Sequence, residues 1–409
     1  MMKNIIFWAA SACLLAACGN DSSQSAAVDY DAEARRIAQT SIIVDTHVDV
    51  PYRLKSRPAD VSKATDGGDF DYPRAVAGGL NAPFMSIYTP GDSEADGTAY
   101  DTAESLIDSM QAIVADSPDK FAIATSVADV REHFEAGIVS LPLGMENGSP
   151  IDGDLANLRH FFERGIRYVS LSHGVSNHLS DSSYDENRRW DGISDFGVEV
   201  IREMNRLGIM VDVSHVSDDA FWEIVEVSET PLIASHSSAR HFTPGWERNI
   251  GDEMIVAIGE SGGVVQINFG SMFVTQEAFD YSTARSEAGE AYLEEHPDLT
   301  QSYIWREYPK IYAAEHGPLP FATIDDVIDH IDHIVKLTSI DHVGIGSDYD
   351  GVGDSLPTGL KDVSSYPNLV AGLLRRGYSE ADIRKILGEN LLRVWQEVED
   401  HAAMTSSNT

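Results

Sequence analysis

The chain has 409 residues, with 66 Asp and Glu against 29 Lys and Arg, and its formal net charge is −37. Such acidity repels phosphate and argues against nucleic-acid binding. The two cysteines, Cys13 and Cys18, both lie near the N-terminus. The remainder therefore has neither a disulfide nor a thiolate metal site, and any metal ion must be bound by His, Asp and Glu.

Residues 1–17 have the pattern of a bacterial lipoprotein signal peptide. After Lys3 comes an apolar run that is too short to cross a bilayer as a helix and that ends in Leu15-Ala16-Ala17-Cys18. This ending resembles a lipobox, so we expect cleavage before Cys18 and attachment of lipid to its thiol. The alternative is an ordinary secretory signal in which Cys18 has no role. Residues 18–30 are small and polar, which is typical of a flexible tether.

The residue after Cys18 is Gly19 rather than Asp, which resembles outer-membrane sorting in Gram-negative bacteria. We therefore predict a protein of the bacterial cell envelope, lipid-anchored in the outer membrane and facing the periplasm. We interpret most of the acidic residues as a strongly solvated surface, because a metal site uses only a few of them.

Residues 31–400 alternate β-branched runs with amphipathic helical stretches, the pattern of parallel βαβ units. There are eight such runs, and eight strands close a TIM barrel. We therefore predict a single α/β domain, a TIM (β/α)8 barrel, over 31–400 and a disordered tail over 401–409. The predicted strands are Ser41–Asp45, Ala82–Tyr88, Ile138–Gly144, Arg167–Leu171, Ile209–Ser214, Leu232–Ser235, Gly263–Asn268 and His342–Ser347.

Two of the intervening helices are well marked by their apolar spacing. One has Phe196, Val200, Met204 and Leu207 on one stripe, with Ser194 as N-cap and Gly208 as the stop signal. The other begins behind Thr323. Residues 270–319 are too long for an ordinary connection after strand seven, so we predict an insertion there, either a lid over the barrel mouth or a peripheral decoration.

Polar side chains that bind metals or move protons follow six of the predicted strands. They are His47 and Asp49, Glu146, His173, His215, His236 and Asp348. In a barrel these strand ends lie on one rim, where such folds hold their active sites. Imidazoles and carboxylates without cysteine suit a catalytic site for zinc or a similar divalent ion. Glu146, alone after strand three, is the natural bridge between two cations.

Other candidate motifs are weaker. The segment "SHSSAR" places Ser beside His236, but no G-x-S-x-G elbow exists, which argues against a serine hydrolase. The segment "GVGDSLPTG" lacks a P-loop lysine. His330 and His333 fall on a predicted helix and His342 precedes its strand, so we expect structural roles for all three.

The residues at the strand ends resemble the renal or membrane dipeptidases, binuclear zinc peptidases of the amidohydrolase superfamily, whose fold is a TIM barrel of the metal-dependent hydrolase type. The resemblance covers about residues 41–396, nearly the whole mature chain, in family order. The matching segments are "DTHVDVP", "GMENG", "RYVSLSH", "GIMVDVSHVS", "PLIASHSSAR", "RNIGDEM", "GGVVQINF", "HVGIGSDYDG" and "YPNLVAGLLRRGYSEADIRKILGENLLRVW".

The resemblance implies two zinc ions bridged by Glu146. His47 and Asp49 would bind one ion, and His215 and His236 would bind the other. His173 would stabilise the developing oxyanion, Arg248 would bind the C-terminal carboxylate of the substrate, and Asp348 would contact its amino group and transfer a proton.

We therefore predict a zinc-dependent dipeptidase that hydrolyses free dipeptides, with L-D dipeptides among the candidates, by a water that the metals activate. One alternative is another binuclear metal amidohydrolase, acting on a lactam, a lactone or an N-acyl amino acid. A more remote alternative is a lipid-anchored peptide-binding protein, which a missing ligand would favour, yet none of the expected ligands is missing. The sequence leaves open whether the chain forms a homodimer.

Overall fold

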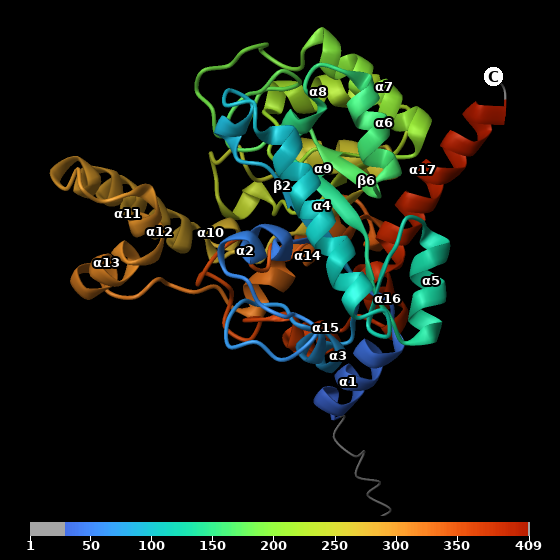
Figure 1. Cartoon of the computed structure of the whole chain (residues 1–409). Helices are drawn as coiled ribbons and strands as arrows, with labels where there is room; N and C mark the ends of the chain where they lie inside the picture. The colour runs from blue at the N-terminus through green and yellow to red at the C-terminus, as the bar shows by residue number, and fades with distance from the viewer. Residues whose placement is uncertain (1–28, 408–409) are drawn as a thin grey trace, which may run out of the picture.

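The structure is a computed structural model that describes residues 29–407. Its centre is a sheet of eight parallel strands in the order β1-β2-β5-β6-β7-β8-β9-β10, surrounded by helices (Figure 1). The strands are β1 (Ile43–Val48), β2 (Leu80–Tyr88), β5 (Leu143–Glu146), β6 (Ile166–Ser170), β7 (Met210–Asp212), β8 (Leu232–Ala234), β9 (Val264–Ile267) and β10 (Val343–Ile345). This confirms the predicted TIM barrel.

The barrel closes between its first and last strands through contacts beyond the end of β10. Asp348 N donates to His47 O at 3.0 Å, and Asp49 N donates to Tyr349 O at 2.8 Å. The buried Asp45 carboxylate accepts hydrogen bonds from Ser347 N at 2.9 Å and from the hydroxyls of Ser347 and Tyr366. The two strands that carry His47 and precede Asp348 are thereby held side by side.

One predicted strand, Ile138–Gly144, is wrong in its extent. It contains β4 (Val139–Leu141), which pairs with β3 (Phe121–Ile123) in a separate two-stranded sheet, and the start of β5. Pro142 separates the two, because proline has no backbone N–H to continue a ladder.

Helices cover the outside of the barrel, and the two with marked apolar stripes are confirmed. Ser194 accepts from Gly197 N at the start of α7, Gly208 ends that helix with φ 85°, and Thr323 and Asp326 form a capping box at α14. The helices are α1 (Tyr30–Thr40), α2 (Val50–Ser56), α3 (Tyr72–Gly78), α4 (Ala99–Asp116), α5 (Val127–Ala136), α6 (Leu155–Glu163), α7 (Asp195–Leu207), α8 (Asp218–Val227), α9 (Asp252–Glu260), α10 (Ser271–Val274), α11 (Gln276–Glu295), α12 (Gln301–Arg306), α13 (Tyr308–His316), α14 (Ile324–Leu337), α15 (Tyr366–Arg376), α16 (Glu380–Arg384) and α17 (Asn390–Ser407).

The ends of the chain differ from the sequence-based expectation. The disordered tail expected over 401–409 is wrong for residues 401–407, which continue α17, where Ala402 is buried. The expected tether over 18–30 stops short of Tyr30, because Asp29 caps α1 through a 3.1 Å hydrogen bond from Ala32 N. The predicted signal segment 1–17 and the predicted lipidation site Cys18 lie outside the described residues.

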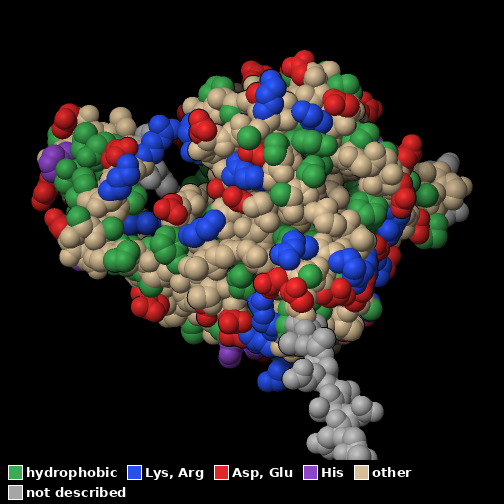
Figure 2. All heavy atoms as spheres, turned by 90° about the horizontal axis from the view of Figure 1, so that it is seen from below, with side chains coloured by type: hydrophobic (Ala, Val, Ile, Leu, Met, Phe, Trp, Pro, Cys, Tyr) green, Lys and Arg blue, Asp and Glu red, His purple; other side chains and the backbone are tan. Residues whose placement is uncertain are grey.

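Residues 270–319 form α10 to α13. Helices α11 to α13 make an arm that extends away from the body of the barrel, as Figures 1 and 2 show. The arm has a small apolar cluster of its own, built on Ile304, Tyr308 and Tyr312. Its base meets the barrel where Trp246 contacts Phe273 and Phe279 at ring distances of 4.9 and 4.8 Å.

The interior of the barrel is filled from below by α17. Trp395 contacts Phe84, Phe84 contacts Tyr168, and the three rings belong to one buried cluster with ring separations of 5.3 and 5.4 Å. The Tyr168 hydroxyl ends this stack 2.8 Å from His47 Nδ1. The barrel is therefore a packed core that supports the polar rim from underneath.

Candidate active site

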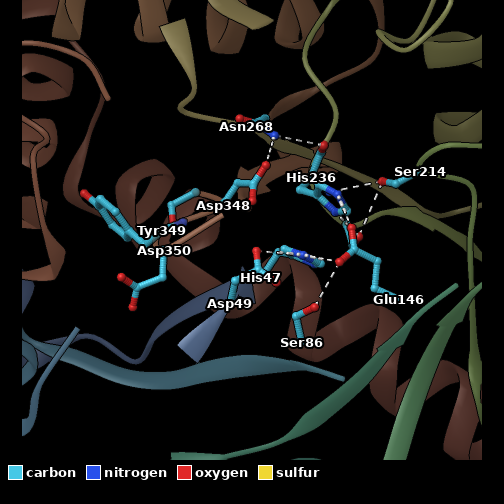
Figure 3. Close-up of polar contacts among 12 residues, drawn as sticks. His47, Asp49, Ser86, Glu146, Ser214, His236, Asn268, Asp348, Tyr349 and Asp350 are labelled. Carbon is cyan, nitrogen blue, oxygen red and sulfur yellow. Dashed lines mark hydrogen bonds and ion pairs between the residues drawn. The ribbon is translucent and has the colours of Figure 1, made fainter. Parts of the chain in front are cut away.

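Seven polar side chains meet at the carboxyl ends of the barrel strands, and Figure 3 shows five of them. His47 lies in β1, Asp49 follows it, and Glu146 is the last residue of β5. The others lie in the loops after β6, β7, β8 and β10, and they are His173, His215, His236 and Asp348. All are buried except His173, whose side chain is 24% exposed. The predicted convergence of strand ends is thus present in the structure.

The Glu146 carboxylate lies at the centre of the group, and its two oxygens point toward different side chains. Its Oε2 atom is 3.4 Å from His47 Nε2 and accepts from Ser86 Oγ at 3.1 Å. Its Oε1 atom is 3.1 Å from His215 Nε2 and 3.3 Å from His236 Nε2. Each oxygen therefore belongs to a different set of donors, as a carboxylate that bridges two cations requires.

The group carries an excess of buried negative charge, which a bound cation would offset. Three buried carboxylates, Asp49, Glu146 and Asp348, lie together. Burial alone lowers the pKa of His47, but Tyr168 and the Glu146 and Asp49 carboxylates raise that pKa well above its ordinary value. The carboxylates thus favour a cation beside His47, whether a proton or a metal ion.

The donor atoms fit a metal ion. His47 Nε2 is buried and has no hydrogen-bond partner, although Asp49 Oδ2 lies 3.5 Å from it. Burial holds the pKa values of His215 and His236 well below the ordinary value, which keeps both rings in the neutral form that binds metals. Sets of three side chains in the group have ligand atoms close enough to share one ion. One set is His47, Glu146 and His236, and another is His47, Asp49 and Asp348.

His236 is oriented by a buried relay that starts at Asp212. The Ser235 hydroxyl donates to Asp212 Oδ2 at 2.6 Å, and the same Oγ atom lies 2.7 Å from His236 Nδ1. Because an ionised carboxylate can only accept, the Ser235 proton points to Asp212 and the Ser235 lone pair accepts from Nδ1–H. The relay therefore fixes the ring tautomer that leaves His236 Nε2 free to bind a metal.

Asp212 also organises the backbone of two loops. It accepts from Ser214 N at 3.0 Å and from Ser235 N at 2.8 Å, and from the Ser170 hydroxyl. It thus connects β6, β7 and β8 just below their ligand-bearing ends. Asp45, within β1, does the same for Ser347 after β10, so a buried Asp positions a metal-binding segment on both sides of the barrel.

Tyr168 contacts His47 from inside the barrel. Its ring occupies the space above Gly144, where an added Cβ would lie 2.0 Å from the ring. Only glycine at this position leaves room for the Tyr168 ring in its present place. The 2.8 Å contact between the Tyr168 hydroxyl and His47 Nδ1 then leaves the opposite nitrogen of the imidazole facing the carboxylates.

Asp348 occupies a turn of unusual backbone geometry. Its φ of 63° is in the left-handed region, and two residues later Asp350 has φ 68°. Asp350 and Asp69 exchange backbone-to-carboxylate hydrogen bonds of 2.8 Å, and Arg53 Nε lies 3.2 Å from Asp350 Oδ2. These bonds hold the turn, and Asn268 Nδ2 donates to Asp348 Oδ2 at 2.8 Å. Burial and the neighbouring Asp49 raise the pKa of Asp348 well above its ordinary value.

Arg248 is buried beside the histidines. Its Nη1 donates to Ser237 Oγ at 2.7 Å and its Nη2 donates to His236 O at 2.9 Å, also lying 3.1 Å from His215 Nε2. Its Nε has no partner. A buried guanidinium with a donor to spare is a binding point for an anion.

Two aromatic side chains border the site without having been expected from the sequence. Tyr88 contacts His173 edge-on at a ring distance of 4.7 Å, and Tyr184 lies 5.9 Å from the His215 ring. Tyr184 is 43% exposed, so it borders the site on its solvent side. His330 and His342 bind backbone groups instead of joining the site, in agreement with the structural roles expected for them.

Comparison with known proteins agrees with this site. The family model of the membrane dipeptidases, peptidase family M19, matches residues 31–409. The structure of the probable dipeptidase PvdM from Pseudomonas aeruginosa is similar at 28% identity, with a TM-score of 0.79, over 91% of this chain and 99% of that chain.

A metallopeptidase from Rhodobacter sphaeroides, solved with a phosphinate mimic of the dipeptide L-Ala-D-Ala, is similar at 26% identity with a TM-score of 0.71. The similarity covers 88% of this chain and 99% of that one. A further structure, of the dipeptidase AC of family M19, matches with the same identity, coverage and TM-score. The match over nearly the whole chain and the two-sided arrangement of metal donors around Glu146 establish that the chain belongs to the membrane dipeptidase family, peptidase family M19, and is a metal-dependent dipeptidase.

Proposed function

We propose that the protein hydrolyses free dipeptides with two zinc ions, including dipeptides whose second residue is D. The observation that carries the proposal is the Glu146 carboxylate, whose two oxygens face separate sets of donors. His47 and Asp49 would hold one ion with Glu146. His215 and His236 would hold the other. Three imidazoles with carboxylates and no thiolate suit zinc.

When bound, the two ions would activate a water and polarise the scissile carbonyl. The side chains around them would place and stabilise the substrate. Arg248 would bind the C-terminal carboxylate, because its buried Nε lacks a partner. His173, the most exposed of the site histidines, would donate to the carbonyl oxygen as negative charge develops there.

Asp348 would contact the substrate amino group and pass a proton to the leaving amine. Asp348 is buried beside Asp49, and Asn268 Nδ2 holds its Oδ2 atom at 2.8 Å, which fixes a carboxyl group where a proton can be transferred. A group that binds a carboxylate and one that contacts an amine, both beside the same ions, would limit the substrate to a short peptide with free ends. A longer peptide would leave a buried charged group unpaired, at a cost of about 1–3 kcal/mol or more.

Acceptance of L-D dipeptides is supported by similarity alone, since the related Rhodobacter sphaeroides enzyme was solved with a mimic of L-Ala-D-Ala. Turnover of L-Ala-L-Ala, L-Ala-D-Ala and their N-acetylated and amidated forms by the zinc-loaded protein tests the assignment. Cleavage of the free dipeptides alone is expected. Equal cleavage of the blocked forms would instead favour an amidohydrolase that acts on N-acyl amino acids or lactams.

Glu146→Gln tests the bridge. An amide cannot bind two cations through two anionic oxygens, so we expect the variant to lose bound zinc and activity together. Zinc is counted by elemental analysis of the dialysed protein, with Glu163→Gln on α6 as the matched control. Full zinc occupancy with normal turnover would remove the bridging role.

We further propose that Cys18 carries a lipid that anchors the domain to the outer membrane, facing the periplasm. The proposal rests on the sequence around Cys18. Within residues 29–407, every helix is too short or too polar to cross a bilayer. The mass of the mature N-terminal peptide is the test, and an unmodified N-terminus at a residue other than Cys18 would contradict the proposal.

A further inference from the structure

A second group of metal-binding side chains lies on the outside of the barrel. It comprises His241 in the short helix η3 (Arg240–Phe242), Asp252 at the start of α9, and His333 on α14. Each offers a donor atom, and the three donors lie within 4.8 Å of one another. His333 Nε2 is 2.8 Å from Asp252 Oδ1, and the His241 and His333 rings stack with centroids 4.3 Å apart.

This group joins the two ends of one loop. His241 lies at the start and Asp252 at the end of the segment 241–252, which carries Trp246 and Arg248 between them. The third member, His333, belongs to α14, a helix that already holds the beginning of this segment. There, His330 Nδ1 accepts from Ala239 N at 3.0 Å, and the Phe242 ring lies 4.2 Å from the His330 ring.

The chemistry of the three donors suits a particular class of ion. Two imidazoles and one carboxylate are ligands of zinc and of similar first-row divalent ions, whereas calcium and magnesium prefer oxygen donors alone. The His333 side chain is 13% exposed and that of Asp252 is 47% exposed, so solvent can reach the group and complete the coordination. We propose that His241, Asp252 and His333 form a third site for a divalent ion of the zinc class.

The consequence for the enzyme follows from the position of the site. An ion bound there would tie both ends of the 241–252 segment to α14 and restrict the motion of the segment. Arg248 would then be held more rigidly for substrate binding, which lowers KM without changing the groups that act on the scissile bond. This effect on KM rests on the proposed role of Arg248, whereas the binding of the ion does not.

The experiment counts ions on the full-length holoenzyme. The protein is dialysed against a range of free zinc concentrations, and bound zinc is measured per chain for the wild type and for His241→Gln, Asp252→Asn and His333→Gln. The control is His401→Gln on α17. His401 lies outside the group, and its Nε2 atom is 3.6 Å from Glu229 Oε2. Thermal unfolding with and without added zinc shows whether each variant is folded and whether the ion stabilises it.

The wild type and the control are expected to bind one more ion per chain than each of the three variants. Once the catalytic site is loaded, further zinc should raise the unfolding midpoint of the wild type and of the His401→Gln control but not of the three variants. In the wild type, filling the third site should lower KM with kcat unchanged, and that change should be absent in His241→Gln. Equal zinc counts in the wild type and in folded His241→Gln and His333→Gln would overturn the site, leaving a His–Asp ion pair with a stacked ring. A failed dipeptidase assay beside the extra ion would instead reject the proposed function alone.

Discussion

Ser235→Ala removes a single oxygen from the relay that connects Asp212 to His236. The Ser235 hydroxyl makes hydrogen bonds of 2.6 Å to Asp212 and 2.7 Å to His236 Nδ1, and all three side chains are buried. Without it, the Nδ1–H of His236 loses its acceptor and the ring loses the group that fixes its tautomer. Loss of such an outer partner typically weakens metal binding by about 10- to 100-fold. That factor corresponds to about 1.4–2.8 kcal/mol.

The assay is competition for zinc with a chromophoric chelator, which resolves the two tight ions of the catalytic site. We expect Ser235→Ala to weaken the binding of the zinc ion that His236 holds. The affinity for the other ion should stay close to its wild-type value. Ser238→Ala is the matched control, because Ser238 lies in the same run but its hydroxyl donates to Asn268 O at 3.1 Å instead of bonding to a histidine. Equal zinc affinities in both variants and the wild type would refute the relay.

Three other substitutions test the substrate pocket, the barrel interior and a buried imidazole. Arg248→Lys replaces a guanidinium that has a free Nε, so kcat/KM for free dipeptides should fall about 10- to 100-fold, and an unchanged value would remove Arg248 from substrate binding. Gly144→Ala places a Cβ 2.0 Å from the Tyr168 ring, so urea unfolding should show a loss of about 1–3 kcal/mol, which a stability equal to the wild type would contradict. Burial lowers the pKa of His330 to about 4, against about 6.5 in the unfolded chain, so the unfolded chain binds the extra proton between these values. Stability from this residue is therefore lost as pH falls from about 6.5 to about 4, and urea unfolding of His330→Asn should show a weaker pH dependence than the wild type by up to about 3 kcal/mol.

The barrel was predictable because its strands are buried on both faces and so appear as short β-branched runs. The exception is instructive. The apolar run "IVSLPLGM" reads as one strand, yet Pro142 divides it between two sheets. The partner of its first half, β3, has three residues and no periodic signal. Only the surrounding packing decides which half of the run enters the barrel.

The metal donors were predictable because each lies at or just after the carboxyl end of a strand, whereas the residues that orient them were not. Tyr168 is indistinguishable in the sequence from any other apolar residue of a strand. Asp212 did leave a signal, since it is a charged residue inside the run "IMVDVS" and needs buried partners to be there. The group of His241, Asp252 and His333 leaves none, because its members come from three elements that only the fold brings together.

The stack of rings that rises from α17 to His47 has a consequence for how the chain matures. A helix made after all eight barrel strands supplies Trp395, which supports Phe84 and Tyr168 under a ligand that belongs to the first strand. A nascent chain that ends before α17 contains all five expected metal ligands but lacks the ring stack that supports His47 from beneath. Hydrolytic activity should thus arise only after α17 has been synthesised and has packed into the barrel. Premature termination near the C-terminus would yield a protease-sensitive product rather than a weakened enzyme.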